Sequence, residues 1–138
     1  MSPSKIERLQ NAGFVHSGTF RGQFFDGEPP ESAGVYAFVV ADEVMYIGAA
    51  QKGLRHRKNS YLRNQAHGRS TRPVHAKLAY ALKHSDGVHM FVAIVPKDGE
   101  WNGLPVNTIA GLEEGLIREF KPVWNRRGLG VGLKQIQN

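Results

Sequence analysis

The sequence predicts a small α/β domain of the α+β type, in which helices flank a mainly antiparallel central sheet of three strands. Residues 34–40 are apolar on both alternating faces, which is typical of a strand covered on two sides. Apolar residues recur at helical spacing after Pro73 and again before Pro122. At 138 residues, the chain has the length of one domain with one core.

The elements follow one another along the chain with short connections. The strands are expected at 34–40, 44–47 and 89–95, and the helices at about 54–66, from Pro73 onward and at about 108–120. The first two strands are close enough in sequence to pair as a hairpin. The glycines and prolines of the segment before the last helix, 96–106, predict a loop.

The core domain is expected to span residues 34–127, preceded by an N-terminal extension, 1–33, and followed by a C-terminal tail, 128–138. Ser4 and Glu7 have the spacing of a capping box, which predicts a short helix near the start of the extension. The phenylalanines that follow this helix need apolar cover. We therefore expect the extension to pack on the core domain.

The connection between the first two strands decides on which face two tyrosines lie. A two-residue turn at Asp42-Glu43 would place Tyr36 and Tyr46 on opposite faces of the hairpin, whereas a three-residue loop would place them on the same face. Side chains alternate between the two faces of a strand, so one residue in the loop changes the result. A shared role for the two tyrosines requires the same face.

The charge distribution indicates a polyanionic partner. The net charge is +6, and the stretch 44–85 contains no Asp or Glu but many Lys and Arg residues. Such clusters bind phosphate backbones without reading sequence. A solvated basic face without a ligand is the alternative, although such faces usually contain interspersed acidic residues. The candidate nucleic-acid-binding residues are Lys52, Arg55, Lys58, Arg63, Arg69 and Arg72.

Composition also excludes several kinds of protein. The chain contains no cysteine, so a disulfide framework, a thiolate zinc site and a cysteine nucleophile are excluded. No apolar run approaches the roughly 18 residues of a membrane span, and the first residues do not have the pattern of a secretory signal. We expect a cytoplasmic protein without membrane association.

Glu113 is the acidic residue that most needs an explanation. It projects from within an apolar stripe of the last helix, where it would be partly removed from water. Burying an unpaired charge is costly, so this carboxylate should meet an arginine, a backbone amide or a metal ion. A salt bridge that serves packing alone is the competing interpretation.

The order of these residues resembles the core of the GIY-YIG nuclease family. The tripeptide Gly34-Val35-Tyr36 is followed, after nine residues, by Tyr46-Ile47-Gly48, then by Arg57 on a basic helix and by Glu113 on the last helix. The resemblance covers residues 34–127. It implies a metal-dependent endonuclease that hydrolyses DNA phosphodiester bonds by in-line attack of water. Glu113 would bind one divalent cation, Mg²⁺ or Mn²⁺.

The resemblance also implies roles for further residues. Tyr36 and Tyr46 would flank the scissile phosphate, and one of them, together with Tyr61, would orient or deprotonate the attacking water. Arg57 would neutralise the charge that builds on the phosphate, with Arg55 as its competitor in the same helix.

Two further features have a counterpart in the family. Asn125 follows Glu113 by twelve positions and closes the core, as an asparagine does in the bacterial excision-repair nuclease. Gly34 and Gly48 would be positions where backbone and side chains approach closely.

Other functions remain open at this point. After the second tripeptide the family often has Lys, Ser or Thr, whereas this chain has Ala49-Ala50. A non-catalytic nucleic-acid-binding module of the same fold is therefore one alternative. An RNA-directed nuclease is another, because both nucleic acids present phosphates. Target choice would come from the segments outside the core, from a homodimer or from an accessory targeting partner.

Overall fold

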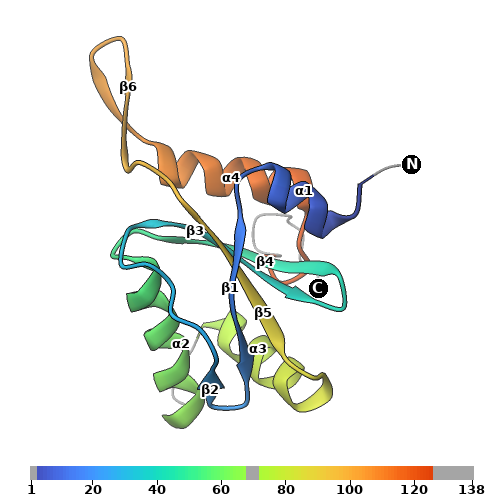
Figure 1. The fold of residues 1–138 in the computed structure, drawn as a ribbon. Coiled ribbons are helices and arrows are strands. Elements are labelled where there is room, and N and C mark those ends of the chain that lie inside the picture. Colours follow the sequence, from blue (N-terminus) through green and yellow to red (C-terminus); the bar gives the residue numbers. More distant parts are fainter. Residues whose placement is uncertain (1–2, 68–71, 126–138) are drawn as a thin grey trace.

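The computed structural model describes residues 3–67 and 72–125, and it consists of helices on both sides of one main sheet (Figure 1). In chain order the elements are α1 (Lys5–Asn11), β1 (Val15–Arg21), β2 (Phe24–Phe25), β3 (Gly34–Val40), β4 (Glu43–Ala50), α2 (Leu54–His67), α3 (Pro73–His84), β5 (Val88–Ile94), β6 (Asp98–Trp101), β7 (Leu104–Asn107) and α4 (Thr108–Phe120).

The main sheet has five strands in the order β2-β1-β5-β3-β4, and all neighbouring strands are antiparallel. The prediction of an antiparallel sheet flanked by helices is confirmed, but the prediction of three strands is wrong. The two additional strands, β1 and β2, come from the segment that the sequence set apart as an extension. Histidine, serine and glycine interrupt the apolar pattern of β1, and the strand is stabilised by its long-range pairing with β5.

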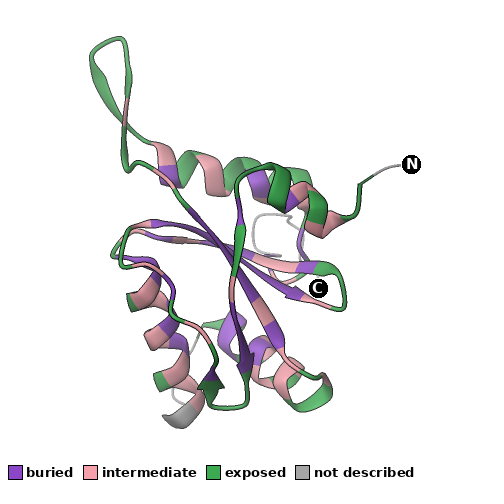
Figure 2. Ribbon diagram, viewed as in Figure 1, coloured by how far each residue is buried: buried purple, intermediate pink, exposed green. Residues whose placement is uncertain are grey.

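The sheet separates two hydrophobic cores. One core contains Tyr36, Phe38 and Tyr61 and lies under α2 and α3; the other contains Val35, Ala37 and Ile47 and lies under α1 and α4. β3 contributes to both cores through alternate residues, and six of its seven residues are buried. Figure 2 shows that burial is concentrated in the central strands.

The helix boundaries follow from local chemistry. At α1 both hydrogen bonds of the capping box are present, between Ser4 and Glu7. At α4 the side chain of Asn107 accepts a hydrogen bond from the Ala110 amide, and the helix ends at Lys121 in the left-handed conformation, directly before Pro122. No helix in the described part of the chain is long and apolar enough to cross a membrane.

The β3–β4 hairpin places Tyr36 and Tyr46 on the same face of the sheet by a route that the sequence did not predict. The turn is formed by two residues, Ala41 and Asp42, which both have positive φ angles, 50° and 65°. This turn alone would place the tyrosines on opposite faces. A β-bulge shifts the register so that Tyr46 pairs with Phe38, which shares its face with Tyr36. The turn expected at Asp42-Glu43 and the three-residue loop are therefore both wrong.

The segment 96–106 is not an irregular loop. It contains the β6–β7 hairpin, which turns at Asn102-Gly103, where both residues have positive φ. Figure 1 shows this hairpin projecting beyond α4, away from the main sheet. Its glycine and proline residues suggested a loop. In the described part of the chain the two strands pair with each other alone and bury few side chains, so their sequence has no apolar pattern that would indicate strands.

Candidate active site

Three tyrosines from three elements meet on the α2/α3 face of the sheet. Tyr36 comes from β3, Tyr46 from β4 and Tyr61 from α2. The Tyr36 and Tyr61 hydroxyl oxygens are 2.7 Å apart and share a hydrogen bond. The ring centre of Tyr36 lies 6.1 Å from that of Tyr46 and 6.0 Å from that of Tyr61. The expected grouping of the three phenols is therefore present.

The tyrosines differ in their access to water. Tyr36 and Tyr61 are fully buried, and burial is the main reason why the pKa of each phenol lies above its ordinary value. Ionisation of the neighbouring tyrosines would raise both pKa values further. These two groups are thus neutral at physiological pH. Tyr46 is only half-buried and lines a surface cavity.

Two arginines contribute positive charge beside the tyrosines. The charge of Arg57, from α2, opposes the rise of the pKa of both Tyr36 and Tyr61. Its Nε atom is buried and has no hydrogen-bond partner among the described residues. Arg72, immediately before α3, donates a long hydrogen bond of 3.5 Å from Nη2 to the Tyr46 hydroxyl. Both guanidinium groups therefore act on the tyrosine cluster.

His75 is a further polar group in this region. It lies in the first turn of α3, is buried, and packs edge-on against the Tyr61 ring with 4.8 Å between the ring centres. Neither ring nitrogen has a hydrogen-bond partner within the described residues. Burial, reinforced by Arg72 and Arg57, lowers the pKa of His75 to about 4. The imidazole is therefore neutral.

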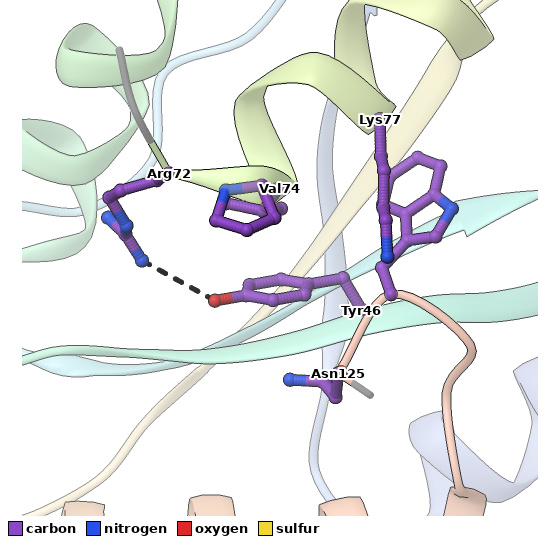
Figure 3. Close-up of a pocket in the computed structure, with 7 residues that line it drawn as sticks. Tyr46, Arg72, Val74, Lys77 and Asn125 are labelled. Carbon is purple, nitrogen blue, oxygen red and sulfur yellow. Dashed lines mark hydrogen bonds between the residues drawn. The ribbon is translucent and has the colours of Figure 1, made fainter. Parts of the chain in front are cut away.

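An open cavity of about 310 Å³ gives access to this cluster. Figure 3 shows Arg72, Val74 and Lys77, which come from α3 and the residue preceding it, above Tyr46, with Asn125 below. The cavity contains two cationic side chains and no acidic one. Its lining consists of Tyr46, Arg72, Pro73, Val74, Lys77, Trp124 and Asn125.

Asn125 fixes the chain after α4 to the edge strand β4. Its side-chain Oδ1 accepts a hydrogen bond from the Ile47 amide, and its Nδ2 donates one to the Ile47 carbonyl, both at 2.8 Å. The Trp124 amide also donates to the Met45 carbonyl. Asn125 is buried, so its amide replaces the strand partner that β4 lacks at this edge.

Glu113 lies on α4, the helix that packs on the edge strand β4 from the face of the sheet opposite to α2 and α3. It is half-buried on α4, between the buried residues Ile109 and Leu116, and α4 packs mainly on β4. α4, which carries Glu113, and the tyrosine cluster thus both adjoin β4, the strand that carries Tyr46. Among residues 3–67 and 72–125, no three His, Asp or Glu side chains gather to form a metal site.

The predicted nucleic-acid-binding residues fall into two groups. Arg55 and Lys58 pair with the segment before β3: Arg55 with Glu28 and Glu31, and Lys58 with Glu28 at 3.1 Å. Lys58 is also buried. The others whose surroundings are described, Lys52, Arg63 and Arg72, are exposed. Arg69 lies outside the described residues.

Sequence reasoning gave no specific place in the site to His75, Lys77 or Trp124. Their positions contain a weak signal, because His75 lies three residues before the buried Leu78 and therefore on the inner side of α3. Gly34 confirms a close approach: a Cβ there would come within 2.2 Å of the Ala93 carbonyl oxygen. The remaining predicted glycine, Gly48, faces Tyr36.

The chain has the GIY-YIG nuclease fold, as the residue pattern predicted. Neither the models of protein families nor the curated protein sequences give a match. The similarity is found in solved structures, and identities below 25% establish the fold alone.

Three of these structures illustrate the similarity. A glutamate-to-alanine mutant of EndoII from bacteriophage T4 has a TM-score of 0.70 at 21% identity, covering 89% of this chain and 99% of that one. The restriction endonuclease HPY188I in complex with product DNA has a TM-score of 0.52 at 14% identity, covering 100% and 87%. The magnesium-bound N-terminal GIY-YIG endonuclease domain of UvrC from Thermotoga maritima has a TM-score of 0.46 at 24% identity, covering 70% and 86%.

Proposed function

We propose that the protein is a metal-dependent DNA endonuclease that hydrolyses phosphodiester bonds at the cavity beside Tyr46. The observation that carries this proposal is the tyrosine cluster itself: a buried, neutral Tyr36–Tyr61 pair supports a third tyrosine that faces an acid-free, cationic cavity. The fold is shared with T4 EndoII and HPY188I, and the latter binds product DNA. These likenesses support DNA as the substrate.

In the proposed mechanism, Tyr46 contacts the attacking water. Its hydroxyl is the one of the three that lines the cavity, and Arg72 donates a hydrogen bond to it. This hydrogen bond orients the Tyr46 hydroxyl, so that it can contact the water and receive its proton during the attack. Tyr36 and Tyr61 are too deeply buried to ionise, so they orient the cluster as neutral hydrogen-bonded groups.

Arg57 would stabilise the negative charge that develops on the phosphate. Its buried Nε has no hydrogen-bond partner within residues 3–67 and 72–125, which leaves a donor for a phosphate oxygen. Arg55, the competitor in the sequence, is already engaged by Glu28, Glu31 and the Pro29 carbonyl. The proposal therefore assigns the catalytic charge to Arg57.

Glu113 is the proposed ligand of one divalent cation. A half-buried carboxylate is a hard oxygen donor that suits Mg²⁺, which retains several waters and takes only one or two protein carboxylates. A site with a single carboxylate agrees with the lack of a larger acidic cluster in the described ranges. When bound, the cation would polarise the phosphate and stabilise the leaving oxygen. Asn125 would hold the end of the α4 segment against β4.

The proposed DNA surface begins at Arg72 and Lys77 in the cavity and extends to the exposed residues Lys52 and Arg63. Arg69 remains a candidate from the sequence. Arg55 and Lys58 contribute less, because acidic residues of the chain already neutralise them. Binding through such a surface decreases steeply as salt concentration rises.

Cleavage of supercoiled plasmid at low salt tests the proposal, with Mg²⁺, Mn²⁺ or EDTA. The wild-type protein is expected to nick or linearise the plasmid only with metal, and Glu113→Ala is expected to bind DNA without cutting it. Glu114→Ala is the matched control, because Glu114 is an exposed neighbour on the same helix, paired with Arg118.

Three results would contradict the proposal. Cleavage by Glu113→Ala above roughly one part in a hundred would remove Glu113 from the metal site. Salt-sensitive binding without cutting under any of the metals would indicate a binding module. Cleavage of RNA in preference to matched DNA would mean that the substrate is RNA and not DNA.

A further inference from the structure

A second, apolar groove adjoins the candidate active site. It has a volume of about 430 Å³ and shares Lys77 and Trp124 with the active-site cavity. α3 forms one wall through Tyr80, Ala81 and His84, while Val40 and Met45 of the β3–β4 hairpin form the opposite side. The two cavities therefore form one continuous depression along α3.

The groove is lined mainly by apolar and aromatic side chains, and no acidic residue lines it among the residues that the structure describes. The Tyr80 ring is 67% exposed and lies beside the His84 ring, with 4.2 Å between the ring centres and a small angle of 36° between their planes. The Trp124 amide donates to the Met45 carbonyl, and the side chain of the next residue, Asn125, is hydrogen-bonded to Ile47. The backbone that carries Trp124 is thus fixed to β4 before any ligand binds.

Such a surface suits a nucleobase better than a phosphate or a sugar. Nucleobases are flat and stack on aromatic side chains, and this stacking is tolerant of sequence. At the boundary of the two cavities the Lys77 ammonium offers a contact for the phosphate that connects the base to the cleaved bond. An acidic or mainly polar ligand would gain nothing from the apolar side of the groove.

We propose that this groove receives a nucleobase that has left the helical stack next to the cleaved phosphate, so that DNA with an unpaired base at the cleavage site is the preferred substrate. The inference rests on the proposed nuclease function, because that function places the phosphate backbone in the adjoining cavity. Its two supports are the continuity of the two cavities and the aromatic, acid-free lining of the groove.

The binding energies favour a base that is already unpaired over a base that must be extruded from an intact duplex. Stacking of one base on an aromatic side chain typically strengthens binding about 5- to 150-fold. Extruding a paired base weakens binding by a similar factor, and this cost is smallest for a base that is already unpaired. On intact duplex the two effects therefore nearly cancel, whereas on DNA with an unpaired base the stacking gain is retained.

The test compares binding of two hairpin DNAs by fluorescence anisotropy in EDTA, where no cleavage takes place. One hairpin is fully paired, and the other carries a single unpaired 2-aminopurine. The wild-type protein is expected to bind the second about ten-fold more tightly or better, within the range that one stacking contact gives. Quenching of 2-aminopurine fluorescence on binding reports stacking of the base directly.

Variants of Tyr80 separate this groove from the rest of the molecule. Tyr80→Ala is expected to lower the preference for the unpaired base about five-fold or more and to restore the 2-aminopurine fluorescence, while binding of the paired hairpin is unchanged. Tyr80→Phe is expected to retain the preference. Phe24→Ala is the matched control, because Phe24 is an aromatic side chain of similar exposure, 61%, on β2.

The following outcomes would overturn the inference. Equal binding of both hairpins by the wild type, or an unchanged preference in Tyr80→Ala, would show that the groove does not hold a base. A change of oligomeric state in Tyr80→Ala, with DNA binding unchanged, would assign the groove to a second copy of the chain. Binding is measured without metal, so the binding test and the cleavage test are independent. Plasmid cleavage by a protein that does not prefer the unpaired base in binding would reject the inference about the groove alone. A binding preference for the unpaired base without any cleavage would reject the proposed nuclease function alone.

Discussion

Gly48 lies directly opposite Tyr36 in the β3–β4 pair, and the Tyr36 ring covers its Cα. A Cβ at position 48 would come within 2.5 Å of both Cζ and the hydroxyl oxygen of Tyr36, a distance that side chains do not reach without movement. Tyr36 has no free space into which to move, because it is fully buried and bonded to Tyr61. The glycine of the second tripeptide therefore sets the position of the tyrosine of the first.

Gly48→Ala is expected to displace Tyr36 and to destabilise the protein by about 1–3 kcal/mol, the usual cost of adding volume to a packed core. Cleavage should decrease more than stability alone explains. Urea unfolding and plasmid cleavage measure the two effects. Gly111→Ala is the control, because a Cβ at that helical position meets nothing within 4 Å, so this change should leave stability equal or slightly higher. Equal stability of the two variants would contradict the proposed contact.

Tyr46 and Tyr61 should respond differently to removal of their hydroxyl groups. Tyr61→Phe leaves the buried Tyr36 hydroxyl without its partner, so the free energy of unfolding should fall by about 1–3 kcal/mol. Tyr46→Phe removes a hydroxyl that faces the cavity, and it should lower kcat by at least about a hundred-fold with little change in stability. Thermal unfolding and single-turnover cleavage distinguish the two. Undiminished cleavage by Tyr46→Phe would assign the water-activating role elsewhere.

His75 should make folding stability depend on pH. Burial lowers its pKa from 6.5 to about 4 in the folded state, so between these values the unfolded chain binds more protons. The contribution of His75 is fully present above pH 6.5 and is lost as the pH falls toward 4. The full shift corresponds to about 3 kcal/mol, and screening by solvent reduces the contribution to stability below this value.

His75→Phe retains an aromatic ring against Tyr61 and removes both unpartnered nitrogens. The variant is expected to lose less stability than the wild type between pH 6.5 and pH 4. Urea midpoints across this range measure the difference. Parallel pH profiles for the two proteins would show that His75 is protonated or exposed in the folded state.

Asn125 should be required for the order of the β4 edge. Asn125→Ala leaves the Ile47 amide and carbonyl without their partners, which should cost about 1–3 kcal/mol. Hydrogen exchange of the Ile47 amide should become faster, since this proton is bonded to the Asn125 side chain. Asn64→Ala is a control, because the Asn64 amide donates to a carbonyl of its own helix. Unchanged exchange at Ile47 would rule out this role.

Exposed and paired basic residues should differ in their effect on DNA binding. Lys52→Ala and Arg63→Ala should each weaken binding and reduce the salt dependence by about one phosphate contact. Lys58→Met should leave the salt dependence unchanged, because Lys58 is buried and paired with Glu28. Binding titrations at several salt concentrations measure these slopes. A smaller slope in Lys58→Met would mean that DNA displaces Glu28.

Local patterns predicted a large part of the architecture. The last helix begins and ends where its Asn107 cap and Pro122 indicate, and the strand expected at 34–40 is β3 without change. The capping box of Ser4 is also present. Each of these features depends on residues close together in the chain, so the sequence alone contains the information.

Features that depend on long-range pairing were missed or predicted incorrectly. β1 is stabilised by β5, more than sixty residues away, and its own sequence is too polar to indicate a strand. The bulge that brings Tyr46 to the face of Tyr36 has no local signal. The charges of Arg55 and Lys58 are neutralised by Glu28 and by its neighbours before β3, which a count of basic residues cannot show.

The sequence by itself determined the central strands β3, β4 and β5 only in part, as the strands at 34–40, 44–47 and 89–95, and it supplied the ordered candidate residues of the site. These features are local or are fixed by order along the chain. The tertiary structure decided which of these groups share an environment. It buried Tyr36, Tyr61 and His75 and left Tyr46 open to the cavity. It also packed α4, which carries Glu113, against β4, which carries Tyr46. Burial and charge pairing arise only when distant segments pack together, and burial keeps Tyr36, Tyr61 and His75 neutral.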